Sequence, residues 1–485
     1  MQSNKINNFQ LVIGLEIHVQ LKTNSKLFSN SPVKFTNKQN SQVSFIDAGF
    51  PGMLPTFNKK VLELAIIIGL LVKGHINKYS SFDRKNYFYP DLPQGYQISQ
   101  FQSPIISNGI ISINLNNKKK VIKIYRIHIE QDAGKSIHIQ KFNKTYIDLN
   151  RAGIPLIEII TNPDFNSPEE IISFLNKLKF ILKYNNICNC NLEKGAIRCD
   201  VNISIKRVGS NKLGNKVEVK NLNSFRNISK AVLIESNRQI NLLKNNLNIV
   251  QETRLYDNKT NTTKGMRKKE KFQDYRYFPD PDLPPLILHQ KIINRIKTSL
   301  HEAPKSRYNR YVNNLNITEY NAYIVTRNLD IANFFDKAVK TISPKLVANW
   351  LCSEVFGRLN KKKLTFSCLP ISSNNFIILL KLIKYNYISG KSAKDVLDKM
   401  FIKNENPEII IKKHKLQQIS VYNEIQDFVL QVLNINKSKV KEYISGKNKL
   451  FAFFIGQAMK LSRGKINPLR LNKILFDELN KCKNQ

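Results

Sequence analysis

The 485-residue sequence predicts an α+β protein in which an N-terminal antiparallel-sheet domain is followed by all-α helical and tail domains. From Leu11 to about Pro285, short alternating apolar stretches are separated by Gly, Pro and Asn, a pattern typical of strands with a few inserted helices. After the proline-rich stretch Asp280–Leu286, helical patterns prevail to the C-terminus. A polar segment at Lys403–Pro407 indicates a second boundary. We therefore expect domains at residues 1–291, 292–405 and 406–485.

Helices are expected in both halves. Within the sheet-rich half they cover Val61–Val72, Pro168–Tyr184 and Ser229–Asn245, and they do not alternate with strands in strict order, which disfavours a doubly wound parallel sheet. In the tail, Asn467 and Pro468 mark a helix start. The preceding helix has an apolar stripe that we interpret as core packing of a small bundle: Phe451, Phe454, Ile455, Ala458 and Met459.

The chain is strongly basic, with 77 Lys and Arg against 36 Asp and Glu and a formal net charge of +41. Such a charge favours a polyanionic partner such as nucleic acid. It is spread along the chain, however, since residues 401–485 contain 16 Lys and Arg against 7 Asp and Glu. The chain is also rich in Asn, Ile and Lys together, which a biased base composition of the genome would also explain. Both explanations stay open.

Cysteine use and hydropathy indicate a cytoplasmic protein. Its six cysteines form neither a disulfide-like framework nor a paired zinc set. Residues 1–10 are polar and lack an apolar signal core, and no run of about 18 apolar residues occurs. We expect a reduced compartment and no membrane association.

Five strand-like segments place chemically capable side chains on one face and aliphatic side chains on the other. In the first, Glu16 and His18 alternate with Leu15, Ile17 and Val19, so a strand puts the carboxylate and the imidazole on one side, about 6.6 to 7 Å apart. The other four segments place the following polar groups on one face: Arg126, His128 and Glu130; Glu158; Arg198, Asp200, Asn202 and Ser204; and Lys216, Glu218 and Lys220.

A half-buried antiparallel sheet with one face in water explains each segment taken singly. Taken together the segments indicate a site, because carboxylates are scarce in this basic chain and yet recur at matching positions beside His, Asn and Arg. A concave sheet surface with these groups would bind a hard cation through oxygen ligands and one imidazole. The six expected site residues are Glu16, His18, Glu130, Glu158, Asp200 and Glu218.

Magnesium with nucleotide phosphates is the natural ligand of such a surface. Four cations would then neutralise phosphate oxygens, which is the electrostatic positioning that phosphoryl transfer requires: Lys85, Arg126, Arg198 and Lys220. Neither Gly-Lys-Ser triplet, at 134–136 and 390–392, has the earlier glycine of a Walker A loop. No nucleophile for amide hydrolysis is recognisable, so any ammonia must come from elsewhere.

Long motifs resemble one family, the B subunit of aspartyl/glutamyl-tRNA amidotransferase. They cover most of the first 290 residues, and weaker similarity extends to Asn349, Trp350 and residues 453–468. The main strings are VIGLEIHVQL, SKLFS, FPGMLP, FDRKNYFYPDLPQGYQISQ, HIEQDAGKS, DLNRAGIPLIEI, RCDVNIS, EVKNLNSF and DYRYFPDPDLPPL.

The resemblance implies a cradle-shaped, kinase-like N-terminal domain that uses ATP and magnesium to phosphorylate the side-chain carboxylate of glutamate or aspartate on a misacylated tRNA. Ammonia from the amidase (glutaminase) of the complex, its A subunit, would displace the phosphate. The small C subunit would complete the heterotrimer, and the helical and tail domains would bind tRNA. Carried onto this sequence, the six expected site residues fall in the family's active-site motifs, with His18, Glu130 and Glu158 as the expected magnesium ligands.

The sequence departs from the family at two places. Many members have a paired-cysteine zinc knuckle after the SKLFS string, whereas Phe28–Leu54 contains no cysteine, so we expect no zinc. Gln131 stands where an acidic residue often follows Glu130, but strand alternation places Glu130, not Gln131, beside His128 and Arg126. An RNA-binding scaffold without chemistry is the alternative. The acidic strand faces disfavour it, because carboxylates repel a phosphate backbone unless a metal intervenes.

Overall fold

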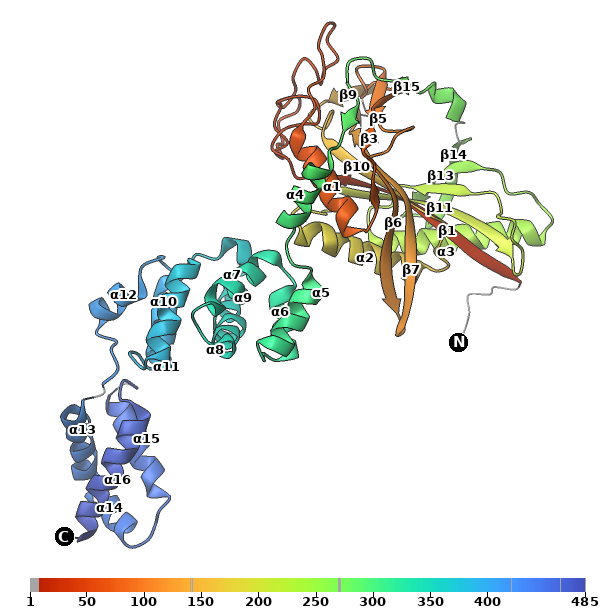
Figure 1. Cartoon of the computed structure of the whole chain (residues 1–485). Helices are drawn as coiled ribbons and strands as arrows, with labels where there is room; N and C mark the ends of the chain where they lie inside the picture. Colours follow the sequence, from red (N-terminus) through yellow and green to blue (C-terminus); the bar gives the residue numbers. More distant parts are fainter. Residues whose placement is uncertain are drawn as a thin grey trace. The chain divides into compact units, whose positions relative to one another are not determined.

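The computed structural model describes residues 8–139, 141, 143–268, 272–419, 421–462 and 464–484. The chain divides into two compact units, one ending at His301 and one beginning at Glu302 (Figure 1). In the described ranges, every strand of two or more residues lies in the first unit, and the second unit is helical. The predicted α+β class is therefore confirmed.

A nine-stranded sheet forms the first unit, in the order β14-β13-β12-β11-β1-β10-β7-β6-β2. Neighbouring strands are antiparallel except for the parallel pair β12 and β13. The five segments with charged faces became β12, β11, β1, β10 and β7, which are consecutive at the centre of the sheet. The strand bounds are β1 Phe9–Gln20, β2 His75–Ile76, β6 Ile106–Leu115, β7 Lys118–Gln131, β10 Pro155–Thr161, β11 Ile197–Arg207, β12 Val217–Lys220, β13 Glu252–Asp257 and β14 Thr262–Lys268.

Helices α2 (Pro168–Tyr184) and α3 (Phe225–Lys244) pack against β6 and β11 and cover one face of the sheet (Figure 1). Helix α2 has the predicted bounds. Helix α3 begins before the predicted Ser229, because the Ser224 hydroxyl accepts a hydrogen bond from the Asn227 amide and caps it. Helix α1 (Lys59–Leu71) is likewise capped by Asn58 and begins two residues before the predicted helix start.

The aliphatic face of the sheet and the apolar faces of these helices form one core. Leu15, Ile17 and Val19 of β1 are buried in the same cluster as Phe174 and Leu178 of α2. Since successive side chains of a strand point to opposite faces, this burial directs the polar residues of β1 to the uncovered face.

A smaller sheet, in the order β15-β4-β5, lies beside the end of β7 that extends beyond β6. Side chains replace the missing strand there: the Gln100 Oε1 accepts from the Ile129 amide at 3.0 Å, and the Gln97 Nε2 donates to the Gln131 carbonyl at 2.7 Å. The bounds of the remaining elements of this unit are β4 Asp83–Asn86, β5 Tyr96–Ser99, β15 Phe278–Pro279, β3 Tyr79–Ser80 with β16 Leu286–Ile287, β8 Lys135–Ile139 with β9 Lys144–Asp148, and α4 Gln290–Ser299.

A buried ion pair fastens the loop that follows the SKLFS string. The Lys26 ammonium lies 3.2 Å from an Asp47 carboxylate oxygen, and Asp47 also accepts from the Ser29 hydroxyl and the Ser44 amide. Gly153 adopts φ +79°, and a Cβ there would lie 2.9 Å from the Asp47 carboxylate, so this site requires glycine. Side-chain contacts of Asp47 thus fix the loop after the SKLFS string.

The second unit contains two hydrophobic cores, one from Tyr311 to Ile411 and one from Ile425 to Leu479. The predicted boundary at 405 falls just before α12, whose Ile410 and Ile411 belong to the first of these cores. The predicted boundary at 291 falls inside α4, which packs against α1 in the first unit. The helix bounds are α5 Pro304–Asn309, α6 Glu319–Thr326, α7 Leu329–Val339, α8 Pro344–Asn349, α9 Phe356–Lys361, α10 Ser373–Lys384, α11 Gly390–Met400, α12 Pro407–His414, α13 Tyr422–Ile435, α14 Lys437–Ile444, α15 Leu450–Leu461 and α16 Pro468–Asn484.

The aromatic stripe near the C-terminus lies on α15 and packs into the last core, with Phe454 and Ala458 buried, which confirms its interpretation as core packing. Helix α16 begins at the predicted Pro468. Among the helices of the described ranges, none is both long and apolar enough to span a bilayer.

The packing of α2 on the sheet is testable by a matched pair of leucine substitutions. Leu178→Ala removes a fully buried side chain and should lower the free energy of unfolding of the first unit by about 2–5 kcal/mol. Leu247→Ala, at a position 53% exposed, should cost less than about 0.5 kcal/mol. Denaturant unfolding of both variants measures the difference, and equal losses would contradict the described core.

Candidate metal centre

The polar face of the central strands gathers all six expected site residues. Directly paired residues of an antiparallel ladder lie on the same face. The register pairs Glu16 with Asp200, His18 with both Glu158 and Arg198, Glu158 with His128, and Asn202 with Glu218. This face is opposite the one that α2 and α3 cover.

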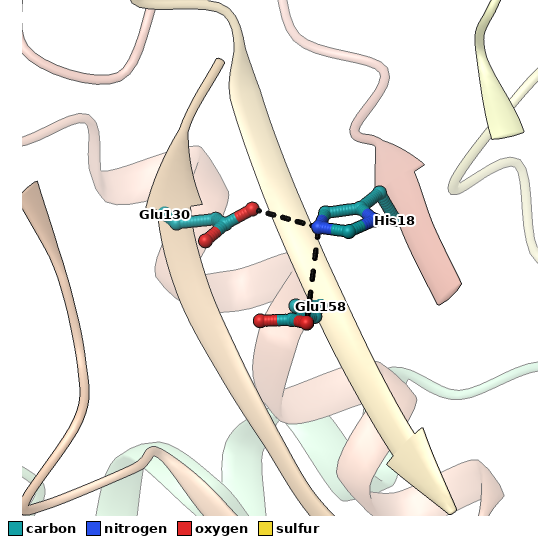
Figure 2. A group of neighbouring side chains, drawn as sticks. All are labelled: His18, Glu130 and Glu158. Atoms are coloured by element: carbon teal, nitrogen blue, oxygen red, sulfur yellow. Dashed lines mark ion pairs between the residues drawn. The ribbon is translucent and has the colours of Figure 1, made fainter. Parts of the chain in front are cut away.

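Three of the six converge on one point. The His18 Nε2 lies 3.3 Å from an oxygen of Glu130 and 3.8 Å from an oxygen of Glu158 (Figure 2). One ligand atom from each residue lies within 4.8 Å of the others. These side chains come from β1, β7 and β10, three adjacent strands. The three residues expected to ligate magnesium are therefore the ones that the fold brings together.

A second imidazole, that of the buried His128, contacts the same two carboxylates. Its Nε2 lies 2.7 Å from Glu158 and 3.8 Å from Glu130. Burial lowers the pKa of His128, but the charges of Glu158 and Glu130 and their hydrogen bonds outweigh burial and raise it to about 9. The pKa of Glu158 is lowered well below its usual value, because His128, His18 and Lys85 outweigh its burial. The protonated His128 thus keeps Glu158 ionised.

The two imidazoles differ in exposure. The His18 side chain is 21% exposed, whereas that of His128 is 3% exposed and is cationic at neutral pH. A protonated imidazole has no lone pair for a metal. The accessible His18 is therefore the imidazole that suits a ligand role, and His128 orients Glu158.

The other three expected residues occupy the neighbouring part of the same face, where they contact protein groups. Lys220 lies between two of them, 3.0 Å from Asp200 and 3.3 Å from Glu218. The Asn202 amide donates to Glu16 at 2.8 Å. The six residues therefore form two adjacent groups, and in the second a lysine lies between two of the three carboxylates.

A cavity of about 390 Å³ lies next to this second group. Glu16 and Asn202 line it, together with Ile160 of β10 and the segment 213–216. Glu16 thus lies between the cavity and the His18 centre.

The four cations expected to bind phosphate have different surroundings. Arg198 is paired at 2.9 Å with Asp132, and Lys220 is paired with two carboxylates. In the part of the chain that the structure describes, neither Lys85 nor Arg126 forms an ion pair, and their cationic groups lie over aromatic rings. Lys85 and Arg126 are therefore the two cations of this set that remain available to an anion.

The convergent triad fits a hard divalent cation. Magnesium binds its ligands at about 2.1 Å, so octahedral neighbours are roughly 3 Å apart and opposite ligands roughly 4.2 Å apart. The His18 distance to Glu130, 3.3 Å, is close to the separation of neighbouring ligands, and the distance to Glu158, 3.8 Å, falls between the two separations. Two carboxylates and one imidazole also leave coordination positions for water and phosphate oxygens.

Sequence reasoning missed two groups beside the centre. The buried Asp132 binds Arg198 and accepts from the Gln20 amide at 3.3 Å. It was missed because it lies just beyond the alternating part of β7. Tyr277 belongs to a motif that is far in sequence from the strands of the centre, and the alternation of polar and apolar residues gave no signal for it.

Gln131 donates to Gln94 at 3.2 Å, away from His18, as strand alternation predicts.

The buried His128 predicts a pH-dependent stability. Because folding raises the pKa of His128 from about 6.5 to about 9, its contribution is complete below pH 6.5 and is lost as pH rises toward 9. Thermal unfolding of the wild type and of His128→Asn should therefore show a difference in melting temperature that shrinks between pH 6.5 and pH 9. A difference that stays constant with pH would contradict a cationic His128.

Two family models match most of the chain. A family model described as the GatB/GatE catalytic domain matches residues 11–294, and one described as the GatB domain matches residues 333–479. The first match contains His18, Glu130 and Glu158.

Curated relatives match almost the whole chain. The aspartyl/glutamyl-tRNA(Asn/Gln) amidotransferase B subunits of Rickettsia typhi and Rickettsia prowazekii are each 48% identical over 472 residues, which is 97% of this chain and 98% of the relative. The protein of the same name from Rickettsia canadensis is 47% identical over the same length. The chain therefore belongs to the family of aspartyl/glutamyl-tRNA(Asn/Gln) amidotransferase B subunits, which confirms the resemblance read from its motifs.

Proposed function

We propose that this chain uses ATP and magnesium to activate the side-chain carboxylate of glutamate or aspartate on a misacylated tRNA, so that the carboxylate can be converted to an amide. The observation that supports this most directly is the convergence of His18, Glu130 and Glu158 beside two available cations, Lys85 and Arg126. Catalysis of phosphoryl transfer consists mainly of positioning and charge stabilisation, and these groups can supply both.

The proposed chemistry has two steps. In the first, an oxygen of the substrate carboxylate attacks the γ-phosphorus of ATP, the bond to the bridging oxygen breaks, and ADP leaves. In the second, ammonia attacks the carbonyl carbon of the acyl phosphate, phosphate leaves with the bonding electrons, and a proton is lost to give the amide. The first step converts a poor leaving oxygen into a good one.

Each part of the centre has a task in this scheme. His18, Glu130 and Glu158 would bind the magnesium ion, which when bound neutralises phosphate charge. Lys85 and Arg126 would bind phosphate oxygens, as charge-assisted donors. His128 keeps Glu158 ionised and oriented, so that the metal ligands are preformed before the nucleotide arrives.

Ammonia would come from a partner protein. Cys188, Cys190 and Cys199 are buried, which keeps their thiols away from a glutamine substrate, and burial also raises the pKa of the Cys199 thiol well above its usual value. We propose an amidase, the A subunit of the complex, as the source of ammonia and a small C subunit as the third member of a cytoplasmic heterotrimer. The substrate is Glu-tRNA(Gln), Asp-tRNA(Asn) or both, since their carboxylates differ by one methylene.

The metal centre can be tested with an isosteric substitution. Glu158→Gln removes a charge without changing shape and should lower the rate of ATP-dependent amidation by about 10-fold to 100-fold in the co-expressed complex. The affinity for tRNA should stay nearly unchanged. Glu193→Gln, at an exposed acidic residue of the same unit, is the matched control. Retention of full activity by Glu158→Gln would exclude the triad from the reaction.

The proposed role of the tail in tRNA binding can be tested by truncation. The cut belongs after α12, because Ile410, Ile411 and Leu416 pack in the preceding core. Removal of residues 421–485 should weaken tRNA binding and reduce its salt dependence, while assembly with the partner proteins is retained. Filter binding at several salt concentrations measures both. An unchanged affinity and salt dependence would limit this segment to a structural role.

A further inference from the structure

The segment that directly precedes α1, residues 39–58, has almost no charge (Figure 1). Charged residues make up 23% of the whole chain, yet this segment contains only one, Asp47. Asp47 is buried and lies 3.2 Å from the Lys26 ammonium, so it contributes no free charge to the surface. We call residues 39–58 the uncharged loop.

Four large apolar side chains of the uncharged loop are exposed to solvent. The exposed fraction is 65% for Phe45, 54% for Phe50, 45% for Met53 and 63% for Leu54. The rings of Phe45 and Phe50 lie 5.1 Å apart, and the Met53 backbone amide donates to the Phe50 carbonyl at 3.3 Å. The four residues therefore form one apolar patch. Such a cluster marks an interaction site, whereas single exposed apolar residues are common on any surface.

The fold holds the uncharged loop in place before any partner binds. The Gln42 backbone amide donates to the Asn150 side chain at 2.9 Å, and the Thr56 backbone amide donates to the Phe28 carbonyl at 2.9 Å. Between these two attachments, the buried Asp47 fastens the middle of the loop. A surface that is fixed in advance loses little conformational freedom when a partner covers it.

The composition of the patch distinguishes between a protein and a nucleic acid as its partner. Nucleic acids are bound through Lys and Arg side chains that contact phosphates. The uncharged loop contains neither residue type, although the whole chain has a formal net charge of +41. The centres of protein–protein interfaces are depleted of charge and enriched in Phe and Met, as this patch is. The patch therefore fits another protein.

The attachment of the loop favours the partner that supplies ammonia. Asn150, which holds the loop, lies shortly before β10, and the Gly153 backbone amide donates to the Asp132 carbonyl just beyond the end of β7. The loop is thus connected to the two strands that carry Glu158 and Glu130. A protein bound to the loop is anchored to the strands of the metal centre, where the proposed reaction consumes ammonia.

We propose that the patch of Phe45, Phe50, Met53 and Leu54 is a docking surface for the ammonia-supplying amidase, which covers it with an uncharged, apolar surface of its own. The inference rests on the function proposed above, and it adds the surface through which the source of ammonia is attached to this chain.

A charge placed in the patch tests the proposal in the co-expressed complex. Leu54→Asp introduces a carboxylate that an apolar partner surface would have to bury, whereas Leu54→Met keeps the patch apolar. Leu247→Asp makes the same change at a position 53% exposed after α3 and is the matched control. Melting temperatures test folding, and Phe45→Asp replaces Leu54→Asp if the latter unfolds. Dilution of each complex, followed by mass photometry, measures the dissociation constant of the amidase.

We expect Leu54→Asp to raise this dissociation constant by at least about 10-fold, while Leu54→Met and Leu247→Asp stay within about twofold of the wild type. At concentrations near the wild-type dissociation constant, Leu54→Asp should lose amidation that uses glutamine. It should retain amidation that uses ammonium chloride, because free ammonia does not require the docked amidase.

An unchanged dissociation constant in a folded Leu54→Asp, or an equal increase in Leu247→Asp, would overturn the proposal. So would a loss of tRNA affinity with the amidase still bound, a loss of the small subunit alone, or a loss only of self-association of this chain. A wild-type complex that assembles but forms no amide from either glutamine or ammonium chloride would instead refute the proposed function.

Discussion

The alternation of side chains across a single sheet is the constraint on which the site depends. Leu15, Ile17 and Val19 are buried beneath α2 and α3, so Glu16 and His18 must face the opposite side. A register shift of one residue would bury the carboxylates and expose the aliphatic residues, and the large apolar core opposes that shift. Three antiparallel strands then bring His18, Glu130 and Glu158 to one point without any loop.

The polar face of the sheet has regions that differ in their charged groups and therefore in the ligands that they can bind. Where Lys220 lies against Asp200 and Glu218, the carboxylates already have a counter-cation. His128 is likewise one cation facing two carboxylates, Glu158 and Glu130, but here the imidazole of His18 converges on the same point, so that three ligand atoms could hold a divalent ion. Beyond them, Lys85 and Arg126 lie on aromatic rings and are available to anions. In the function proposed above, a metal ion and phosphates would bind side by side on this face.

Much of this arrangement could be predicted from the sequence, because it is local. Period-two alternation placed Glu130 and not Gln131 on the polar face, and the structure agrees. What alternation could not supply was tertiary pairing: that Arg198 would be paired with Asp132, and that Tyr277 would return from a remote segment to stack on Phe101. Helix starts were displaced where a capping side chain, Ser224 or Asn58, lay outside the apolar period.

The proposed activity depends most on a divalent ion at the convergence of β1, β7 and β10. Crystals of the complex grown with manganese in place of magnesium would locate it by anomalous scattering. We expect a peak about 2.1–2.2 Å from the His18 Nε2 and from one oxygen each of Glu130 and Glu158. A fully occupied manganese ion elsewhere on the sheet, with those three side chains paired to each other as in Figure 2, would contradict the central claim.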